Sequence, residues 1–467
     1  MTALYKIAQY FPVIALAIRA KHKQLLLLML FFAQYSYSSN VPFPPTDMLF
    51  STATAAAYQD IARDKKIGII TADLEQIIKT SEVAILSKDS ITAIATILGN
   101  MPAIARQIHL PQIQKIAALA LSLHNIAIAE TLLKTAKNQG DIFSEARITF
   151  ELAKYHADQG QWANVITRLR DSGVIESLTK DNAAEANLLI GSALQQQKRH
   201  REAMSYYEKI KADSVHYRLA QLNLATANIR QDWWTDAHMA INNAIKKNSS
   251  KKDELDYRLH TLLGFSQIQF GFYRDARESF RNVSLKSDYT NRALLGLGMA
   301  ALHQEDFIGA LSAFKHLRTK EEKDISVAES YLLNAFTLRQ LGQYDDALAA
   351  YQEAVVYYSD LHNQQTNTIS NLNEQRISLQ IINSIFIRPE SRNDKQLRHF
   401  VEKINIIADL LNYPVSSITK TQLTNTKILL EKEYVNLAKT ILRSEQESIA
   451  SYLSQSKFGL ATIYDGK

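Results

Sequence analysis

YLLNAFTLRQLGQYDDALAAYQEA, residues 331–354, contains two stretches of helix-forming residues separated by a short turn at Gly342. On both sides of the turn, apolar residues recur every three or four positions, which is the spacing that places side chains on one face of an α-helix. Glycine ends helices because it adopts left-handed backbone geometry without strain. The stretch therefore predicts two helices joined by a tight turn.

The same helix–turn–helix pattern returns along much of the chain. One small or aliphatic position of the second helix recurs at intervals of 36, 38, 34, 39, 34 and 37 residues, at Ala129, Val165, Ala203, Ala237, Ala276, Ala310 and Ala347. A two-helix unit with a period near 34 residues is typical of helical repeat arrays, in which each unit buries its apolar face against its neighbours. We therefore expect about seven stacked units over residues 111–358.

The composition agrees with an all-helical protein. Glycine and proline number 14 and 8 among 467 residues, and 46% of the residues are apolar. Few helix breakers and many helix formers favour α-helix throughout. The chain has no cysteine, which excludes disulfide bonds, thiolate metal sites and a cysteine nucleophile.

The positive charge is concentrated at the N-terminus. The formal net charge is +6, but Lys6, Arg19, Lys21 and Lys23 precede the first acidic residue, Asp47, so 6 − 4 leaves +2 for the rest of the chain. Nucleic-acid binding requires a concentrated basic face. We therefore expect no nucleic-acid partner.

Residues 1–38 have the features of a targeting segment. A basic stretch at 19–23 precedes the apolar run LLLLMLFFA at 25–33, and small residues follow at Ser36 and Ser38. This order is typical of a signal peptide, with cleavage for instance after Ser38, and the run is too short to span a bilayer as a helix. We expect export to the periplasm. The alternatives are an uncleaved N-terminal anchor in the inner membrane and an ordinary buried helix.

The repeated segments resemble the tetratricopeptide repeat (TPR) family, as found in exported bacterial proteins. In residues 331–354 the positions that carry the resemblance are Tyr331, Ala335, Leu338, Gly342, Tyr344, Ala347, Tyr351 and Ala354. The match is strongest over 257–358 and moderate over 184–246. The resemblance implies an all-α fold, a right-handed superhelical solenoid of stacked helix pairs, with between five and eight units. It also implies that small residues let helices approach closely while aromatic residues fill the space between pairs.

Two further helical regions flank the array. Residues 46–110 are expected to be a helical cap or degenerate units, because they lack the turn signature. Residues 359–467 are expected to form a C-terminal helical bundle with a long amphipathic helix, whose apolar stripe is Leu423, Leu430, Tyr434, Leu437, Ile441, Ile449, Tyr452, Leu453, Leu460 and Tyr464. The stripe predicts antiparallel packing against helices in 372–411, or alternatively a coiled-coil contact through which the chain self-associates.

No catalytic motif appears in the sequence. It contains no HExxH, no glycine-rich phosphate loop and no GxSxG, so we expect a protein that is not an enzyme and uses no cofactor or metal. The adjacent Trp233 and Trp234 could be interpreted as a ligand-binding surface. Trp234 occupies the position that Tyr273 and Tyr344 hold in later units, which predicts packing and leaves Trp233 as the exposed member.

The resemblance to TPR proteins implies a binding surface on the concave wall, formed by the first helix of each pair. The positions that point away from the second helix are Arg230, Arg258, Phe265, Gln269, Arg292, Met299, His303, Phe336, Arg339 and Gln340. Arginine, methionine and aromatic residues are common in protein interfaces, and the arginines suit a segment with acidic character. The alternative is that these residues are simply solvent-exposed helix faces.

These observations predict a non-catalytic protein-interaction scaffold of the bacterial envelope. The expected partners are proteins, such as an envelope complex, with membrane contact only through an uncleaved N-terminal segment. One alternative is an adaptor subunit of an envelope enzyme or of a polysaccharide or protein export system. Another is a secreted effector that binds a host protein.

Overall fold

The computed structural model describes residues 46–62, 68–170, 173–248, 252–321, 324–372 and 392–465. All regular structure in these ranges is helical, which confirms the expected all-α fold. The expected signal segment, residues 1–38, lies outside the described residues.

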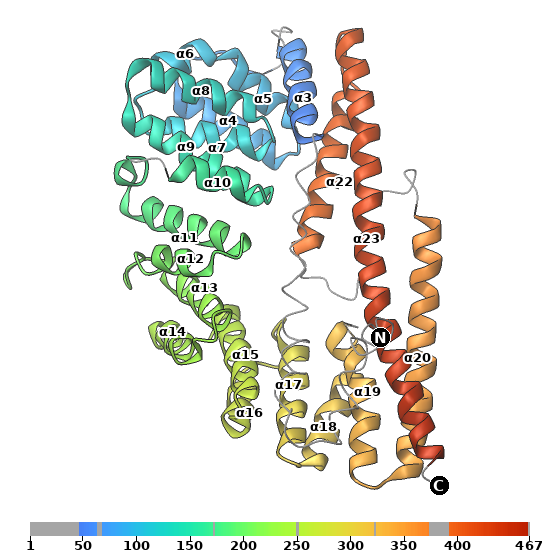
Figure 1. Ribbon diagram of the computed structural model, residues 1–467. Coiled ribbons are helices and arrows are strands. Elements are labelled where there is room, and N and C mark those ends of the chain that lie inside the picture. The colour runs from blue at the N-terminus through green and yellow to red at the C-terminus, as the bar shows by residue number, and fades with distance from the viewer. Residues whose placement is uncertain are drawn as a thin grey trace, which may run out of the picture.

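Sixteen of the helices form eight consecutive pairs, and we call the first helix of each pair helix A and the second helix B (Figure 1). The pairs are α4 (Leu74–Leu86) with α5 (Ser90–Gly99), α7 (Gln112–Ser122) with α8 (Ile126–Gln139), α9 (Ile142–Asp158) with α10 (Trp162–Leu169), α11 (Lys180–Gln196) with α12 (His200–Tyr207), α13 (Tyr217–Ile229) with α14 (Trp234–Lys247), α15 (Glu254–Gln269) with α16 (Tyr273–Arg281), α17 (Thr290–His303) with α18 (Phe307–Arg318), and α19 (Ile325–Gln340) with α20 (Tyr344–Asn371). Between pairs lie the short α6 (Met101–Arg106) and the 3₁₀ helix η3 (Ile175–Ser177).

The turn between helix A and helix B has the same geometry in all eight pairs. One residue adopts left-handed backbone, and these residues are Lys88, His124, Gly160, Lys198, Asp232, Gly271, Glu305 and Gly342. The backbone N–H of the next residue donates to the carbonyl oxygen five residues before it, over 2.8–3.1 Å. This hydrogen bond closes the end of helix A and sets the direction of helix B.

The shared turn adds one pair to the seven expected from the sequence. The turn at Lys88 lies 36 residues before the turn at His124. Ala93 follows Lys88 by the same five residues that separate Ala129 from His124, and both alanines are fully buried. The first pair of the repeat series therefore lies at 74–99, within the region expected to be a cap or degenerate units.

Glycines in helix A hold the aromatic residues of helix B. The ring of Phe280 on α16 packs so closely on Gly264 of α15 and on Gly296 of α17 that neither position has room for a Cβ atom. Tyr207 packs in the same way on Gly191, within the pair α11–α12. These contacts show the expected packing, in which a small residue admits a ring between neighbouring helices.

Three helices outside the pairs join the two ends of the array. They are α3 (Thr46–Ala62), α22 (Arg392–Leu410) and α23 (Ser417–Tyr464). Figure 1 shows α23 extending from beside α3, near the first pairs, to beside α20 of the last pair. At 1.5 Å per residue, its 48 residues span about 70 Å.

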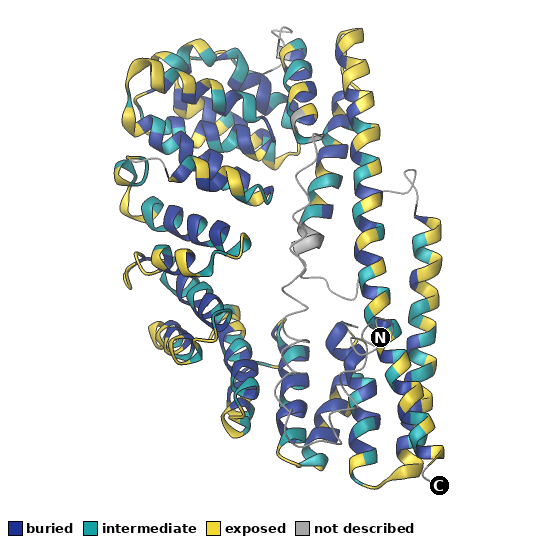
Figure 2. Cartoon of the chain, in the orientation of Figure 1, coloured by how far each residue is buried: buried dark blue, intermediate teal, exposed yellow. Residues whose placement is uncertain are grey.

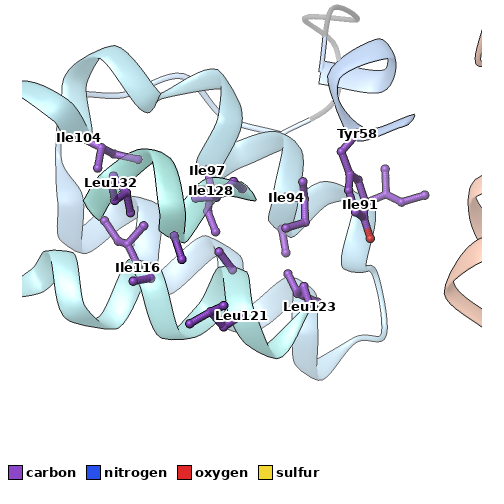
Figure 3. Close-up of a cluster of buried hydrophobic side chains, with 14 of the residues drawn as sticks. Tyr58, Ile91, Ile94, Ile97, Ile104, Ile116, Leu121, Leu123, Ile128 and Leu132 are labelled. Atoms are coloured by element: carbon purple, nitrogen blue, oxygen red, sulfur yellow. The ribbon is translucent and has the colours of Figure 1, made fainter. Parts of the chain in front are cut away.

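The apolar stripe of α23 is mostly buried or half-buried within the chain, in contact with both ends of the array, and its last residue, Tyr464, is exposed. Leu423 and Leu430 belong to a cluster with residues of α3–α9 and α22. Ile449, Tyr452 and Ile463 belong to another cluster with residues of α19 and α20. The isoleucine-rich interior of the first cluster is drawn in Figure 3. Figure 2 shows buried residues at intervals along the length of α23.

Candidate partner-binding surface

The structure places nine of the ten predicted contact residues on three consecutive A helices. Three lie on each of α15, α17 and α19, and Arg230 is the C-cap of α13. All ten therefore belong to the A-helix side of four neighbouring pairs.

Most of these residues fall into three rows that repeat with the turns. From α15 to α17 and from α17 to α19 the turns are 34 and 37 residues apart, at Gly271, Glu305 and Gly342. The same intervals relate the members of an arginine row (Arg258, Arg292 and Glu329), an apolar row (Phe265, Met299 and Phe336) and a polar row (Gln269, His303 and Gln340, preceded by Arg230). On each helix the three rows are seven and four residues apart, so they share one face.

The apolar row is mostly buried. Phe265 and Met299 are each 8% exposed and belong to the core cluster of α15–α18. The ring of Phe265 meets the ring of Phe280 edge to face, with centroids 4.9 Å apart. Phe336 alone is half-buried. The wall is therefore built on Phe265 and Met299, and their role in partner binding stays a prediction.

The arginine row changes sign at its third member. Arg258 is exposed and Arg292 is half-buried, whereas Glu329 on α19 is buried. Burial raises the pKa of the nearby Asp324, and the positive charge of Arg292 opposes that shift. The row therefore offers two cations, on α15 and α17. Glu329 was not among the residues predicted from the sequence, although it lies 37 residues after Arg292 and so occupies the same position of the repeat.

Two members of the polar row interact with neighbouring pairs, His303 by stacking and Arg230 through its charge. The His303 ring stacks on Tyr273 of the preceding pair, with centroids 4.7 Å apart and planes at 2°. Burial lowers the pKa of His200, and the charge of Arg230 lowers it further. Gln269 is half-buried and Gln340 is exposed, so the amides are the more accessible part of this row.

Arg339 lies outside the three rows. The same intervals align it with Leu302 and Ile268, which lie on the packed side of α17 and α15. Its positive charge acts on Tyr351 of helix B, whose pKa burial raises to about 12. Arg339 is therefore directed differently from Arg258 and Arg292.

Two other features are absent from the part of the chain that the structure describes, a metal-site cluster and a membrane-spanning helix. No group of three or more histidine, aspartate or glutamate side chains there has the arrangement of a metal site. Across the same residues, none of the helices combines the length and the apolar character needed to cross a bilayer.

Two segments match family profiles of the tetratricopeptide repeat, residues 184–211 and 261–320. They coincide with α11–α12 and with the pairs that carry most of the rows. No protein of curated function matches the sequence.

Solved structures with a similar course of the chain share little sequence with it. The apo form of RapI is 15% identical, with 72% of this chain and 97% of RapI covered and a TM-score of 0.46. The Cut9–Hcn1 hetero-tetramer of APC/C is 13% identical, with coverage of 80% and 68% and a TM-score of 0.32. The P58(IPK) TPR domain is 12% identical, with coverage of 77% and 99% and a TM-score of 0.20. These likenesses are too weak to inform function.

Proposed function

We propose that this tetratricopeptide-repeat protein is a non-catalytic scaffold that binds an acidic segment of a partner protein across the A helices α15, α17 and α19. The observation that carries the proposal is the alignment of the rows over three consecutive pairs. An extended or helical segment that crosses the helices meets chemically similar groups at each step.

Charge decides the kind of segment. The exposed guanidinium of Arg258 and the half-buried one of Arg292 occupy equivalent positions on adjacent helices. Arginine forms paired, charge-assisted hydrogen bonds with carboxylates. The amides of Gln269 and Gln340 supply further hydrogen bonds at the other edge of the face. An acidic partner segment satisfies this arrangement, whereas a basic segment is repelled.

We further propose that the scaffold acts in the bacterial envelope. The support is the signal-like segment at 1–38, whose basic stretch, apolar run and small residues stand in the order that export requires. N-terminal sequencing of the chain recovered from cell fractions tests this part. A periplasmic chain that begins after Ser38 is expected, and a cytoplasmic chain that begins at Met1 contradicts it.

Site-specific photocrosslinking in the producing cell tests the binding face. A photoreactive amino acid replaces Gln269, Phe336 or Gln340 in the full chain, and crosslinked segments are identified by mass spectrometry. The matched surface control is Met239 on helix B α14, which is 58% exposed. We expect acidic segments to crosslink from the A-helix positions and not from Met239.

Charge reversal separates the arginine row from general electrostatics. Arg258→Glu with Arg292→Glu should weaken binding of the crosslinked segment at least tenfold, since both cations become repulsive. The control pair Arg274→Glu with Arg443→Glu makes the same charge change at exposed positions elsewhere. Equal affinity for the two double variants would overturn the proposed face.

A further inference from the structure

Two neighbouring pairs depart from the others at the residue that begins helix B. This residue is the N-cap, and in six pairs it is polar: Asp89, Asn125, Gln161, Arg199, Asp306 and Gln343. In α14 and α16 it is Trp233 and Phe272, which carry no acceptor for the helix N–H groups; of the six polar residues, Asp89, Asn125 and Asp306 form a side-chain cap. A local rule that is broken without a stabilising gain often marks a functional position.

Phe272 is the exposed part of an aromatic cluster, and the equally exposed Trp233 directly precedes another member of that cluster, Trp234. Phe272 and Trp233 are each 42% exposed. Trp234, next to Trp233, stacks on Phe270 with centroids 4.8 Å apart, and its ring lies 5.5 Å from that of Phe272. The guanidinium of Arg201, from the preceding pair, lies 5.4 Å from the centre of the Trp233 ring. The cluster thus joins two pairs and holds the Phe272 ring in place, whereas the Trp233 ring is contacted by Arg201.

A shallow, open depression adjoins the rings of Trp233 and Trp234. Its volume is about 340 Å³, and its lining is Asp232, Trp233, Trp234, Thr235 and Asp236. Both carboxylates are exposed, and among the described residues neither forms an ion pair. Arg201 contacts Trp233 but does not line the depression. The lining therefore combines two indole rings with two exposed carboxylates, of which Asp236 lies in the first turn of α14.

We propose that this depression binds a lysine or arginine side chain of a partner protein, with an adjacent apolar residue of the partner covering Phe272. Cations are attracted to the face of an indole ring, and carboxylates form charge-assisted hydrogen bonds with ammonium and guanidinium groups. The charge preference is opposite to that of Arg258 and Arg292. This site is thus a second one, and it goes beyond the proposed function.

Tryptophan fluorescence of the full chain measures the binding. The chain has three tryptophans, and Trp162→Phe leaves only the two indoles of the depression as reporters. The probes are capped tetrapeptides Gly-Phe-Arg-Gly, its citrulline analogue, which has nearly the same shape without the charge, and Gly-Phe-Glu-Gly. We expect the arginine peptide to bind at least tenfold more tightly than the citrulline peptide, and the glutamate peptide not to bind.

Variants assign the binding to this site. Asp236→Asn should remove most of the difference between arginine and citrulline peptides. Asp346→Asn is the matched control, because Asp346 is exposed and occupies the same turn position in the last pair, after the polar Gln343. Trp233→Ser should abolish binding while raising the thermal midpoint, since serine caps a helix and tryptophan does not.

Three outcomes would contradict the proposed cation site. Equal binding of the arginine and citrulline peptides, or equal effects of Asp236→Asn and Asp346→Asn, would show that the depression does not select a cation. Unchanged arginine-peptide binding by the folded Trp233→Ser variant, followed through Trp234, would overturn the site itself. These results are independent of the partner that binds the A helices.

Discussion

The two ends of α23 contact the array through different main interactions, although hydrogen bonds of Gln365 with Glu445 and of Gln446 with Thr366 accompany the packing on α20. At the C-terminal end, Gly459 lies under the ring of Tyr351 with no room for a Cβ atom, as Gly296 lies under Phe280. This end of α23 therefore takes the place that the next helix A would have, and it covers the last pair by the packing rule of the repeats themselves.

At the other end, polar pairs surround the apolar contact. Leu423 and Leu430 are buried with the first pairs. The Asp60 carboxylate on α3 accepts hydrogen bonds from the Ser416 N–H over 3.1 Å and from the Thr419 hydroxyl over 2.8 Å. On α22, which precedes α23, Lys403 pairs with Asp47 of α3 over 2.8 Å.

The same helix therefore closes the array through two kinds of contact. Ring-on-glycine packing depends on shape and is insensitive to pH. Ion pairs and hydrogen bonds depend on partners that must be present and correctly charged. We expect the end at α3 to open first when conditions change.

The largest expected effect comes from Asp47→Ala. The Asp47 carboxylate accepts hydrogen bonds from Lys403 and from Gln161, each over 2.8 Å, and the Lys403 side chain is 5% exposed. Removing the carboxylate leaves the buried Lys403 ammonium without its charged partner, which lowers the free energy of unfolding by about 3 kcal/mol. Denaturant unfolding with hydrogen exchange of α22 measures the loss. The double variant Asp47→Ala with Lys403→Met removes the buried cation as well, so it should cost less free energy of unfolding than Asp47→Ala alone. A larger cost for the double variant would contradict this account.

Gly459→Ala is expected to loosen the other end. In a long helix this change normally gains about 1 kcal/mol, but here the new methyl group meets the Tyr351 ring. Overpacking of this kind costs about 1–3 kcal/mol, so net destabilisation is expected, with faster exchange in α20. The exposed Ser454→Ala on the same helix is the control. A stabilised Gly459→Ala variant would show that Tyr351 does not depend on this glycine.

Asp60→Ala should have a smaller effect, confined to the start of α23. It removes the acceptor for two donors, and each lost hydrogen bond costs about 1 kcal/mol. Thr419→Val removes only one of these donors and should cost roughly half as much. Exchange rates of residues 416–430 measure both effects. Faster exchange at 449–463 instead would contradict a local role for Asp60.

The smallest effect is expected from pH. Burial lowers the pKa of His124, which faces Glu402, His399 and Lys403 of α22. A histidine whose pKa is lowered by folding stabilises the native state fully above its ordinary pKa of about 6.5, and this contribution is lost as the pH falls below that value.

Glu402 does not change in the same range. The pKa of Glu402 is lowered to about 2, chiefly by its hydrogen bonds with His124 and His399, so its contribution is lost only between about 4.5 and 2. Between pH 7.5 and 5.5, exchange in α22 should rise relative to the C-terminal end of α23. His124→Asn, which suits the left-handed backbone at this residue, should reduce that rise; an unchanged rise would exclude His124 as its cause.

Much of the repeat array could be predicted from the sequence because its packing is local. Gly342 and Tyr344, or Gly271 and Tyr273, stand at fixed offsets within one pair and recur in the next. The pair at 74–99 was expected only as a cap or degenerate units, because Ser90 stands there where Tyr273 and Tyr344 stand in later pairs and Lys88 replaces the glycine. The backbone hydrogen bond, rather than a glycine, defines the turn.

The sequence predicted which residues occupy equivalent positions on the candidate binding face. It did not predict which of their side chains are exposed. The interval of 34 residues places Arg258 with Arg292 and Phe265 with Met299. Their burial depends on neighbouring pairs, and it separates the accessible Arg258 from the buried Phe265. The direction of Arg339, near Tyr351, likewise depends on side chains of another helix.

By itself, the sequence determined a helical repeat array with small residues beneath aromatic rings, because periodic packing repeats the same short-range pattern. The tertiary structure adds that α23 joins both ends of that array, that Asp60 of α3 binds the start of α23, and that Asp47 of α3 binds Lys403 of the preceding helix α22. These pairs join residues about 356 positions apart. No local pattern specifies such a contact, because an amphipathic stripe fixes which face of α23 is buried but not which helices cover it.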